Sequence, residues 1–363
     1  MRVAIDLSSA AKRSPTGIGR YQVELVRAMA PMLGVADEMV LTTRLKRWTA
    51  RRHLGSVSNL DGICGFRLFP RRVDIYHSAA IGRARTPRAL WAVTVHDTAT
   101  IDAPELTSAE FARTHGNKIR TVLARADYVF AISRFVRNRL LELESSLDPR
   151  RVRVTYPGCD HAELSAEPAQ DDESVRRHYG LAGERYVLSV GRIARRKNPE
   201  NLVRAFAAAN SAAGMLLVMV GEPGDADLAR AIEDSGLSDR IRLPGRVPDA
   251  HLPALYRGAA MFAMPSFYEG FGIPILESMA CGTPVLIGNR PALIEVAGDA
   301  AVAIDPGDVA AMAAAIDRIL SDRALAQSLR ARGLDRAREF TWTACARTTL
   351  EGYRELLAMG SRR

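Results

Sequence analysis

The sequence predicts an α/β protein with two doubly wound parallel-sheet domains, and three observations support this prediction. The chain has 363 residues, which exceeds the length at which a single hydrophobic core usually stops growing. Short apolar runs alternate with longer amphipathic segments, as in βαβ units. The polar stretch around residues 157–175 interrupts this alternation, which then starts again. We therefore expect a first domain at residues 1–165 and a second at residues 176–340.

In the first half, the expected strands are short runs rich in β-branched and aromatic residues. They lie at residues 2–7, 39–43, 74–78, 91–97, 128–133 and 151–156. The segments at residues 19–33 and 133–144 repeat apolar side chains with a helical period, so we expect helices there. Strands that alternate with helices in this way form a parallel sheet.

The second half repeats the pattern with six further short runs. These expected strands lie at residues 186–191, 216–221, 241–245, 261–266, 284–288 and 301–305. A helix is expected at residues 198–210, directly after the first of them. The last amphipathic segment, residues 341–358, is followed by no strand. It can therefore pack on either domain, including back onto the first.

Composition excludes several classes of protein. No apolar run approaches the ~20 residues that a bilayer-spanning helix needs. The four cysteines, Cys64, Cys159, Cys281 and Cys345, have no metal-ligand spacing, which favours a reducing compartment over a disulfide framework. We expect a cytoplasmic protein, either free or peripheral on the inner face of the cytoplasmic membrane.

Positive charge is concentrated in the first half of the chain. Residues 1–160 hold 26 Lys and Arg against 15 Asp and Glu (26 − 15 = +11), whereas the remainder holds 24 against 26 (24 − 26 = −2). The densest basic stretch, LKRWTARRH, contains Lys46, Arg47, Trp48, Arg51 and Arg52. This stretch has three interpretations: a solvated helical face, a surface that binds an anionic membrane and, least favoured, a surface that binds nucleic acid.

Polar and glycine-rich residues follow several of the expected strands. In open parallel sheets, ligands bind at the carboxyl edge, just after each strand. The residues to inspect are therefore 16–20, 96–97, 191–197, 221–222 and the stretch PSFYEGFGIPILESMACGTPVL at 265–286.

The stretch at 265–286 predicts an anion site at a helix N-terminus. Gly270, Phe271 and Gly272 lead to Pro274, which is suited to the first turn of a helix. The amides before this proline point out of the positive end of the helix. Glu269 is expected on the rim of the site and Glu277 in the first helical turn. The purely structural alternatives are that Gly270 and Gly272 form a tight turn and that the helix dipole favours Glu277.

Two cations strengthen the functional interpretation. GRIARRKN places Arg192 at the end of one strand and Lys197 just before the next helix. Two cations and a helix end that converge on one crevice can hold a diphosphate. A carboxylate can accept both protons of a vicinal diol, so acids beside a diphosphate fit a sugar nucleotide.

Together, EGFGIPILESMACGTPV, GRIARRKN, the early TGIGRY and the VTVHD strand end resemble retaining glycosyltransferases of family 4. The resemblance covers nearly the whole chain, and the EGFG block is its most specific part. It implies the GT-B fold, in which two Rossmann-like doubly wound parallel-sheet domains face each other across a cleft. It also implies an enzyme that transfers a hexose from a sugar nucleotide.

The resemblance assigns a role to each matching side chain. Arg192 and Lys197 match the basic pair that binds the donor diphosphate. Glu277 matches the acid that holds the ribose hydroxyls, and Glu269 the acid that faces the donor sugar. His96, at the end of WAVTVHD, matches a histidine that contacts the sugar near the reacting carbon.

Backbone groups complete the donor site that the resemblance implies. The amides of Gly270, Phe271 and Gly272 lie beside Glu269. Gly17 and Gly19 match a loop that approaches the phosphate and the acceptor. Val247, in LPGRVPD, falls where the backbone of the family contacts the base.

The implied chemistry relies on side-chain charge. Negative charge builds on the leaving diphosphate, so Arg192 and Lys197 would act most strongly at the transition state. No residue stands out as a nucleophile, and the resemblance implies that the leaving phosphate takes the acceptor proton with retention of configuration. His96 then orients and stabilises, which makes His96, Arg192, Lys197 and Glu269 the catalytic set.

No obligatory metal is expected. Asp225 and Asp227 form a DxD triplet, which binds metal in another glycosyltransferase fold. They lie at the start of the helical pattern that runs through ADLARAIEDSG, so helix capping is the better explanation.

The resemblance is closest to bacterial mannosyl- and rhamnosyltransferases of surface polysaccharide synthesis. It favours GDP-mannose as the donor and a glycan or polyprenyl-linked acceptor, with no nucleic acid partner. Rhamnosyl, glucosyl or N-acetylglucosaminyl transfer from another nucleotide sugar is the alternative. A dehydrogenase is disfavoured because TGIGRY lacks the third glycine of the dinucleotide fingerprint. A sugar-nucleotide epimerase and a nucleic-acid-binding protein are remoter alternatives.

Overall fold

The computed structural model describes the chain except for residues 12–16, 44–72, 83–87, 160–163, 225–226 and 361–363. The basic stretch with Lys46, Arg47, Trp48, Arg51 and Arg52 lies outside the described residues. The chain divides into two compact units. Unit 1 comprises Met1–Asp102, Ala109–Gly158 and Thr341–Arg363, and unit 2 comprises Ala103–Ser108 and Cys159–Phe340. The main crossover from unit 1 to unit 2 therefore follows Gly158. The sequence predicted that the first domain ends at residue 165 and that the second begins at residue 176.

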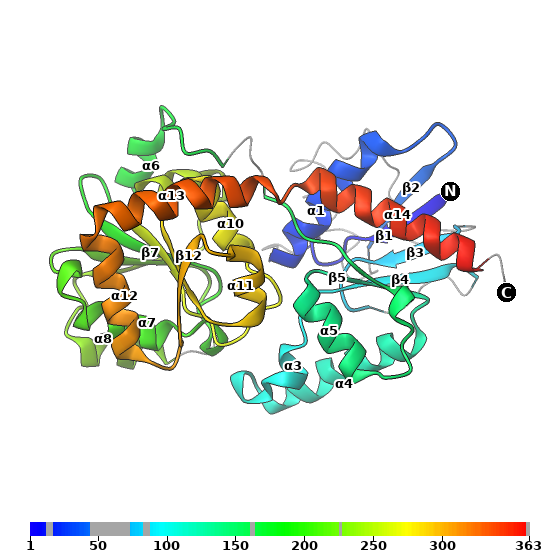
Figure 1. The fold of residues 1–363 in the computed structure, drawn as a ribbon, viewed down its shortest axis with the longest axis horizontal. Coiled ribbons are helices and arrows are strands. Elements are labelled where there is room, and N and C mark those ends of the chain that lie inside the picture. Colours follow the sequence, from blue (N-terminus) through cyan, green and yellow to red (C-terminus); the bar gives the residue numbers. More distant parts are fainter. Residues whose placement is uncertain (12–16, 44–72, 83–87, 160–163, 225–226, 361–363) are drawn as a thin grey trace. The chain divides into compact units, whose positions relative to one another are not determined.

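The described part of unit 1 contains a parallel sheet of six strands in the order β2-β1-β3-β4-β5-β6. The strands are β1 (Arg2–Asp6), β2 (Glu38–Thr42), β3 (Ile75–Ser78), β4 (Leu90–Val95), β5 (Tyr128–Ala131) and β6 (Val152–Val154). Most of their residues are buried, because helices cover both faces of the sheet. In Figure 1, α1 (Gly17–Met29) and α14 (Trp342–Gly360) lie on one side of this sheet, and α4 (Ala109–Arg125) and α5 (Arg134–Leu143) on the other.

The last helix, α14, packs on the first sheet, although it follows the whole of unit 2 in the chain. Its Tyr353 is fully buried, and the hydroxyl lies 2.6 Å from Nδ1 of His77 on β3. Arg153 on β6 forms ion pairs with Glu351 and Glu355 of the same helix. A buried aromatic anchor and these charges together specify where α14 lies.

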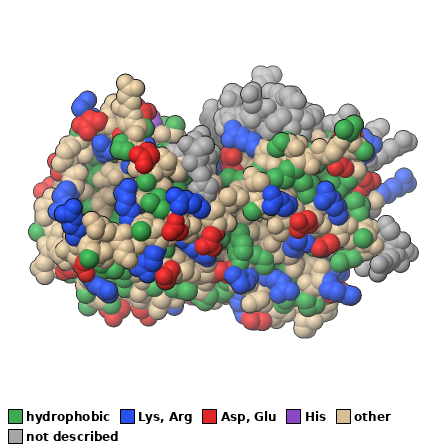
Figure 2. All heavy atoms as spheres, turned by 45° about the horizontal axis from the view of Figure 1, so that its top comes forward, with side chains coloured by type: hydrophobic (Ala, Val, Ile, Leu, Met, Phe, Trp, Pro, Cys, Tyr) green, Lys and Arg blue, Asp and Glu red, His purple; other side chains and the backbone are tan. Residues whose placement is uncertain are grey.

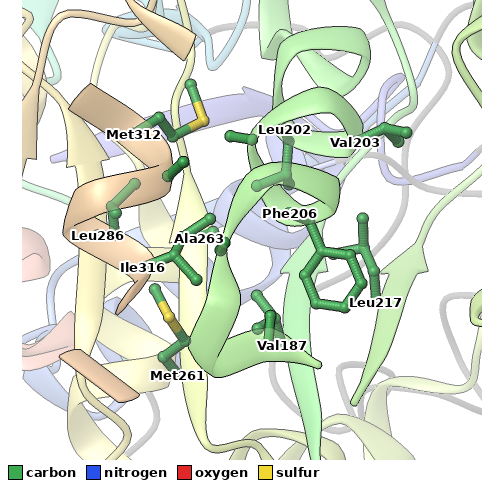
Figure 3. Packing of buried hydrophobic residues seen from close by; sticks show 14 of the residues in the cluster. Val187, Leu202, Val203, Phe206, Leu217, Met261, Ala263, Leu286, Met312 and Ile316 are labelled. Atoms are coloured by element: carbon green, nitrogen blue, oxygen red, sulfur yellow. The ribbon is translucent and has the colours of Figure 1, made fainter. Parts of the chain in front are cut away.

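Unit 2 repeats the architecture, with a described parallel sheet in the order β12-β11-β10-β7-β8-β9. The strands are β7 (Tyr186–Val190), β8 (Leu216–Val220), β9 (Ile241–Gly245), β10 (Met261–Met264), β11 (Val285–Gly288) and β12 (Ala301–Ile304). Figure 3 shows α7 (Pro199–Ala208) and α12 (Val309–Ser321) packing onto β7, β8, β10 and β11. Phe206, Leu217 and Ile316 are among the fully buried side chains of this core.

The remaining described α-helices complete the two units. They are α3 (Ala99–Asp102), α6 (Asp172–His178), α8 (Leu228–Ser235), α9 (Leu252–Gly258), α10 (Ile273–Ala280), α11 (Pro291–Ala297) and α13 (Arg323–Arg338). Two parallel sheets flanked by helices confirm the predicted α/β fold class.

The described surface mixes both signs of charge. On the face drawn in Figure 2, Lys and Arg side chains lie among Asp and Glu side chains. Ion pairs such as Arg338–Asp335 on α13, at 2.7 Å, are part of this pattern. Among the described helices, none is both long enough and apolar enough to span a membrane. Cys159, Cys281 and Cys345 are buried and unbridged, while Cys64 lies outside the described residues.

Candidate functional site

The order of the second sheet singles out one position on its carboxyl edge. β7 and β10 are neighbours there, but the chain runs outward from β7 through β8 and β9, and from β10 through β11 and β12 in the opposite direction. Ligands of open α/β sheets bind where the strand order reverses in this way. The two loops that leave this point are residues 191–198, after β7, and residues 265–272, after β10.

The loop after β7 depends on backbone conformations that its sequence specifies. Gly191 has φ 138°, and a β-carbon there would lie 3.1 Å from Cε of Lys197. Arg195–Lys197 form a 3-10 turn, and Asn198 ends it in the left-handed region with φ 59°. Asparagine tolerates this region better than most residues. The loop therefore folds back so that Lys197 lies against Gly191.

Asn198 ties the two loops together. This side chain is buried, and its Nδ2 donates to the carbonyl oxygens of Pro265, at 3.1 Å, and Pro306, at 2.6 Å. The amide of Phe267 also donates to the carbonyl oxygen of Arg196, at 2.9 Å. Buried hydrogen bonds of this kind hold loops in a single register. The segment after β10 is therefore held against the turn that carries Arg196 and Lys197.

Three charged side chains meet at this junction, which we call the ion triad: Glu269, Arg196 and Lys197. Nζ of Lys197 lies 2.9 Å from Oε1 of Glu269, and Nη1 of Arg196 lies 2.7 Å from Oε2. The same Nη1 donates to the carbonyl oxygen of Tyr268, at 2.7 Å. Glu269 is only 8% exposed, so its carboxylate is largely removed from water.

The triad keeps Glu269 ionised. Burial by itself would raise the pKa of this carboxyl, but the charges of Arg196 and Lys197 outweigh burial and lower its pKa from 4.5 to about 2. At neutral pH the side chain is therefore a carboxylate, which accepts hydrogen bonds and donates none.

The segment from Glu269 into α10 brings backbone amides to the same place. Gly272 has φ 114° and immediately precedes Ile273, the first residue of the helix. Pro274 occupies the first turn, where its missing N–H is not needed. Phe271 is buried, and its ring packs edge-on against Phe340 with centroids 5.7 Å apart. The helix thus directs its positive end toward the glycine segment that follows Glu269.

The prediction that Glu277 lies in the first turn of this helix is wrong. Because α10 begins at Ile273, Glu277 is its fifth residue and belongs to the second turn. Its carboxyl is buried, with 4% exposure, and Oε2 accepts a hydrogen bond of 2.7 Å from the hydroxyl of Tyr256 on α9. A hydrogen bond within the core, rather than the helix dipole, therefore accounts for the placement of this acid.

The other predicted residues of unit 2 do not join the triad. Arg192 is exposed and forms no ion pair with the described carboxylates, although it lies in the same loop as Lys197. The side chain of Val247 follows β9 and is buried, with 3% exposure. Asp227 stands at the N-cap of α8 without a capping hydrogen bond, and its DxD partner Asp225 lies outside the described residues.

In unit 1, His96 directly follows β4 and is half-buried. Its Nε2 lies 3.1 Å from the carbonyl oxygen of Ala79, and its ring meets Tyr21 edge-on with centroids 4.8 Å apart. Burial lowers the pKa of this imidazole, against the opposing effects of the Ala79 carbonyl and Asp97. His96 is therefore neutral at pH 7, and because a carbonyl only accepts, the proton is on Nε2 and the lone pair on Nδ1.

Gly17 and Gly19 lie in the first turn of α1 rather than in a loop. Three residues further along this helix, Gln22 links three segments at the carboxyl edge of the first sheet. Its Oε1 accepts from the amides of Ser9, at 3.1 Å, and Ala10, at 2.9 Å. Its Nε2 donates to the carbonyl oxygen of Ala79, at 3.4 Å, which also binds His96.

Four residues of these sites, Arg196, Asn198, Tyr256 and Gln22, were not predicted from the sequence. The RRK run offered three adjacent cations, and nothing in their order indicates which one reaches Glu269. The partners of Asn198 and Tyr256 are distant in the chain, so no local pattern could reveal them. A fully buried glutamine on an amphipathic helix, such as Gln22, is a signal that helical periodicity could have found.

Comparison with known proteins agrees with this architecture. Residues 171–336 match the family described as glycosyl transferases, group 1. The O-antigen chain mannosyltransferase B of Escherichia coli is 32% identical over 378 residues, which covers 94% of this chain and 96% of the relative. The D-inositol 3-phosphate glycosyltransferase of Salinispora tropica is 37% identical over 259 residues, covering 65% of this chain and 52% of the relative.

A solved structure shows the fold. HepE of Anabaena, in complex with UDP and glucose, superposes with a TM-score of 0.76 at 16% identity, covering 98% of this chain and all of that chain. Its likeness establishes the GT-B architecture of two parallel-sheet domains. The nearly full-length match to the Escherichia coli relative goes further, and on it we conclude that the chain belongs to the group 1 glycosyltransferases.

Proposed function

We propose that this protein is a retaining glycosyltransferase of family 4. It moves mannose from GDP-mannose to a glycan or a lipid-linked acceptor in surface polysaccharide synthesis. The choice of mannose is supported by the Escherichia coli relative, which is named for mannosyl transfer to the O-antigen chain and matches this chain along nearly its whole length.

The observation that carries the proposal is the ion triad at the strand-order reversal of unit 2. Glu269 is a buried carboxylate, ready to accept two hydroxyl protons of a hexose. Lys197 beside it offers a cation on a flexible stem, and the glycine amides that lead into α10 lie at the positive end of that helix. A sugar diphosphate needs both groups: a hydrogen-bond acceptor for the sugar hydroxyls and positive charge for the diphosphate.

The remaining donor contacts extend this assignment. We assign Arg192, which is exposed in the same loop as Lys197, to the diphosphate together with Lys197. Glu277 is assigned to the ribose hydroxyls, since Tyr256 holds its carboxyl in one position. The backbone of Val247 is assigned to the base, and Gly17 and Gly19 to the phosphate and acceptor side. These roles follow the family pattern at each position.

The chemistry we propose is charge stabilisation without a metal. The bond from the anomeric carbon to the diphosphate breaks, and the negative charge that develops on the phosphate oxygen is stabilised by Lys197, Arg192 and the helix amides. The oxygen of the incoming hydroxyl bonds to the anomeric carbon on the face that the phosphate leaves, so configuration is retained, and its proton passes to the leaving phosphate. Nδ1 of the neutral His96 accepts a hydrogen bond from a hydroxyl of the donor sugar.

The Salinispora relative favours one alternative. At 37% identity over 65% of this chain, it is named as a D-inositol 3-phosphate glycosyltransferase, a name that does not specify mannose. Rhamnosyl, glucosyl or N-acetylglucosaminyl transfer from another nucleotide sugar is therefore our second candidate.

A nucleotide panel tests the donor assignment. Thermal unfolding is measured with GDP, UDP, ADP and dTDP, because a ligand that binds only the folded state raises the unfolding temperature. GDP is expected to give the largest shift, and a larger shift with UDP or dTDP would select the second candidate. No shift with any of the four would remove the donor site.

Transfer is then assayed with the matching nucleotide sugar and glycan acceptors. NMR of the product reports the anomeric configuration, and an inverted product would contradict retention. Addition of EDTA tests whether transfer needs a metal ion. Unchanged turnover is expected, and abolished turnover would contradict metal-independent transfer.

We also propose that the enzyme works at the inner face of the cytoplasmic membrane, where a polyprenyl-linked acceptor resides. The basic stretch with Lys46, Arg47, Trp48, Arg51 and Arg52 supports this proposal by composition alone. Sedimentation with vesicles of anionic or neutral lipid tests it. Pelleting that does not depend on lipid charge would contradict the proposal.

A further inference from the structure

We propose that Arg196 positions Glu269 during turnover, by holding this carboxylate in place when Lys197 leaves it for the donor diphosphate. The inference rests on the proposed function, and it assigns a role to a residue that the family pattern does not single out. Arg196 is thus a positioning residue that acts through Glu269.

The contacts of Arg196 tie it to the segment that carries Glu269. Its Nη1 reaches both Oε2 of Glu269 and the carbonyl oxygen of Tyr268, each at 2.7 Å. Its own carbonyl oxygen accepts the amide of Phe267, at 2.9 Å. Side chain and backbone therefore both anchor Arg196 to the stretch from Phe267 to Glu269, so its guanidinium is pre-organised beside the carboxylate.

Lys197 is held differently. Its Nζ contacts Oε1 of Glu269 at 2.9 Å, and its stem runs past Gly191, where a β-carbon would lie within 3.2 Å of Nζ. Because Gly191 has no side chain, the ammonium has room to swing on its four-carbon stem. A compact, mobile charge suits the exchange from a carboxylate to an incoming phosphate.

The burial of Glu269 makes a second cation necessary. An 8% exposed carboxylate that loses its only counter-ion must either take up a proton or remain unpaired at a cost of several kcal/mol. With Arg196 in place, the triad carries a net charge of +1 before the donor binds, and an Arg196–Glu269 pair of zero charge remains after Lys197 leaves. Glu269 then stays ionised and oriented toward the sugar.

The charges that face Glu269 define a pH test. The groups that lower its pKa are Arg196 and Lys197, both from the 3-10 turn after β7. Once Lys197 is committed to the diphosphate, Arg196 is the cation left beside Glu269. Its removal should raise the pKa of Glu269 in the donor complex, so turnover should fall as the pH drops through the raised value.

The test compares Arg196→Met, Arg196→Lys and Lys197→Met. The matched control is Arg204→Met, which removes the same charge from an exposed position on α7, where the guanidinium donates to Asn201. Each variant is assayed for kcat and KM with GDP-mannose between pH 4.5 and 8, for GDP affinity by calorimetry, and for thermal unfolding. If UDP gives the larger thermal shift with the wild-type protein, UDP replaces GDP in these assays and a UDP-sugar replaces GDP-mannose.

We expect Arg196→Met to lower kcat by about 10- to 100-fold, the range for misplacing a positioned group. GDP affinity should change by less than about threefold, because GDP lacks the sugar that Glu269 holds. The acid limb of the kcat profile should move upward by about one pH unit or more. Arg196→Lys should restore the acid limb, since it keeps the charge, but only part of kcat, since one ammonium cannot reproduce the guanidinium fork.

Two outcomes would overturn the inference. If Arg196→Met matches Arg204→Met in kcat and acid limb, Arg196 has no positioning role. If it weakens GDP binding as much as Lys197→Met does, Arg196 is itself a phosphate ligand. If Arg196→Met fails to fold, Arg196→Lys decides the test. The inference then requires that Arg196→Lys keeps the wild-type acid limb while its kcat stays below that of wild type. Failure of the proposed function is distinct, because wild type itself would then bind no nucleotide, and this inference would fall with it.

Discussion

The described sheets of the two units are both parallel and six-stranded, but their carboxyl edges carry different kinds of chemistry. In unit 2, the loops after β7 and β10 hold three charged side chains in contact, with a carboxyl pKa lowered to about 2. In unit 1, the loops after β3 and β4 are joined by neutral groups, the Gln22 amide and the His96 imidazole, on one carbonyl oxygen. The difference teaches that the carboxyl edge of a parallel sheet can carry either full charges or neutral hydrogen-bonding groups.

This contrast suggests a division of labour under the proposed function. The positive charges of unit 2 are worth most where negative charge develops during the reaction, which is on the diphosphate. Neutral acceptors suit hydroxyl groups, whose orientation matters more than their charge. Four substitutions or measurements would break or sharpen the contrast, and they run from the largest expected effect to the smallest.

Lys197→Ala should have the largest effect. Loss of the cation that stabilises the leaving diphosphate is expected to lower kcat/KM by about 10²- to 10³-fold. Circular dichroism and thermal unfolding should show an intact fold, since the side chain is not part of the apolar core. Steady-state kinetics of sugar transfer would measure the loss. Activity within threefold of wild type would remove Lys197 from the donor site.

The ionised state of Glu269 should appear in the pH dependence of stability. Its folded pKa, about 2, lies below the ordinary 4.5, so the carboxylate stabilises the fold above pH 4.5. That stabilisation, about 3 kcal/mol, should be lost as the pH falls from 4.5 through 2. Denaturant unfolding of wild type and Glu269→Gln across this range measures it. Parallel stability curves for the two proteins would show that the triad does not hold Glu269 ionised.

Tyr256→Phe removes a single hydroxyl and tests the support of Glu277. The buried carboxyl loses the donor to its Oε2, which should lower the free energy of unfolding by about 1–3 kcal/mol. Nucleotide affinity should fall as well if Glu277 holds the ribose. Urea unfolding and GDP calorimetry report the two effects separately. A variant that is destabilised but binds GDP as wild type does would place Glu277 outside the nucleotide site.

His96→Ala should have the smallest effect of the four. Because this imidazole is neutral and acts as a hydrogen-bond acceptor, its loss should lower kcat by about tenfold, equivalent to about 1.4 kcal/mol. GDP affinity should be unchanged. The wild-type kcat profile should also show no inflection near pH 6.5, since burial lowers the pKa of His96. A loss of about 10³-fold together with such an inflection would instead indicate proton transfer by His96.

Much of the fold was predictable, because local patterns carry it. Each predicted strand overlaps an observed one from β1 to β12, since a strand buried on both faces must be a short apolar run whatever its neighbours are. Element ends were harder to place. The error at Glu277 arose because a helix that follows glycines can begin at several positions, and the left-handed backbone of Gly272 sets its start at Ile273.

Two of the three members of the ion triad were selected from the sequence, and the third was not. Lys197 and Glu269 were both selected from strand ends, and they lie in contact. Arg192 was selected as their companion, but the structure places Arg196 there and leaves Arg192 exposed. The direction of each side chain in GRIARRKN depends on a 3-10 turn that ends at the left-handed Asn198, and no repeat in the sequence encodes that turn.

By itself, the sequence determined the alternation of strands and helices, the plan of two parallel-sheet domains and the polar, glycine-rich character of the strand ends. These properties depend on hydrophobic periodicity and on glycine and proline, which act over a few residues. Only the tertiary structure decided that Arg196 shares Glu269 with Lys197, that Tyr256 holds Glu277, and that α14 returns to the first sheet. Those contacts join residues far apart in the chain, where burial of a charge or a hydroxyl selects the partner that can satisfy it.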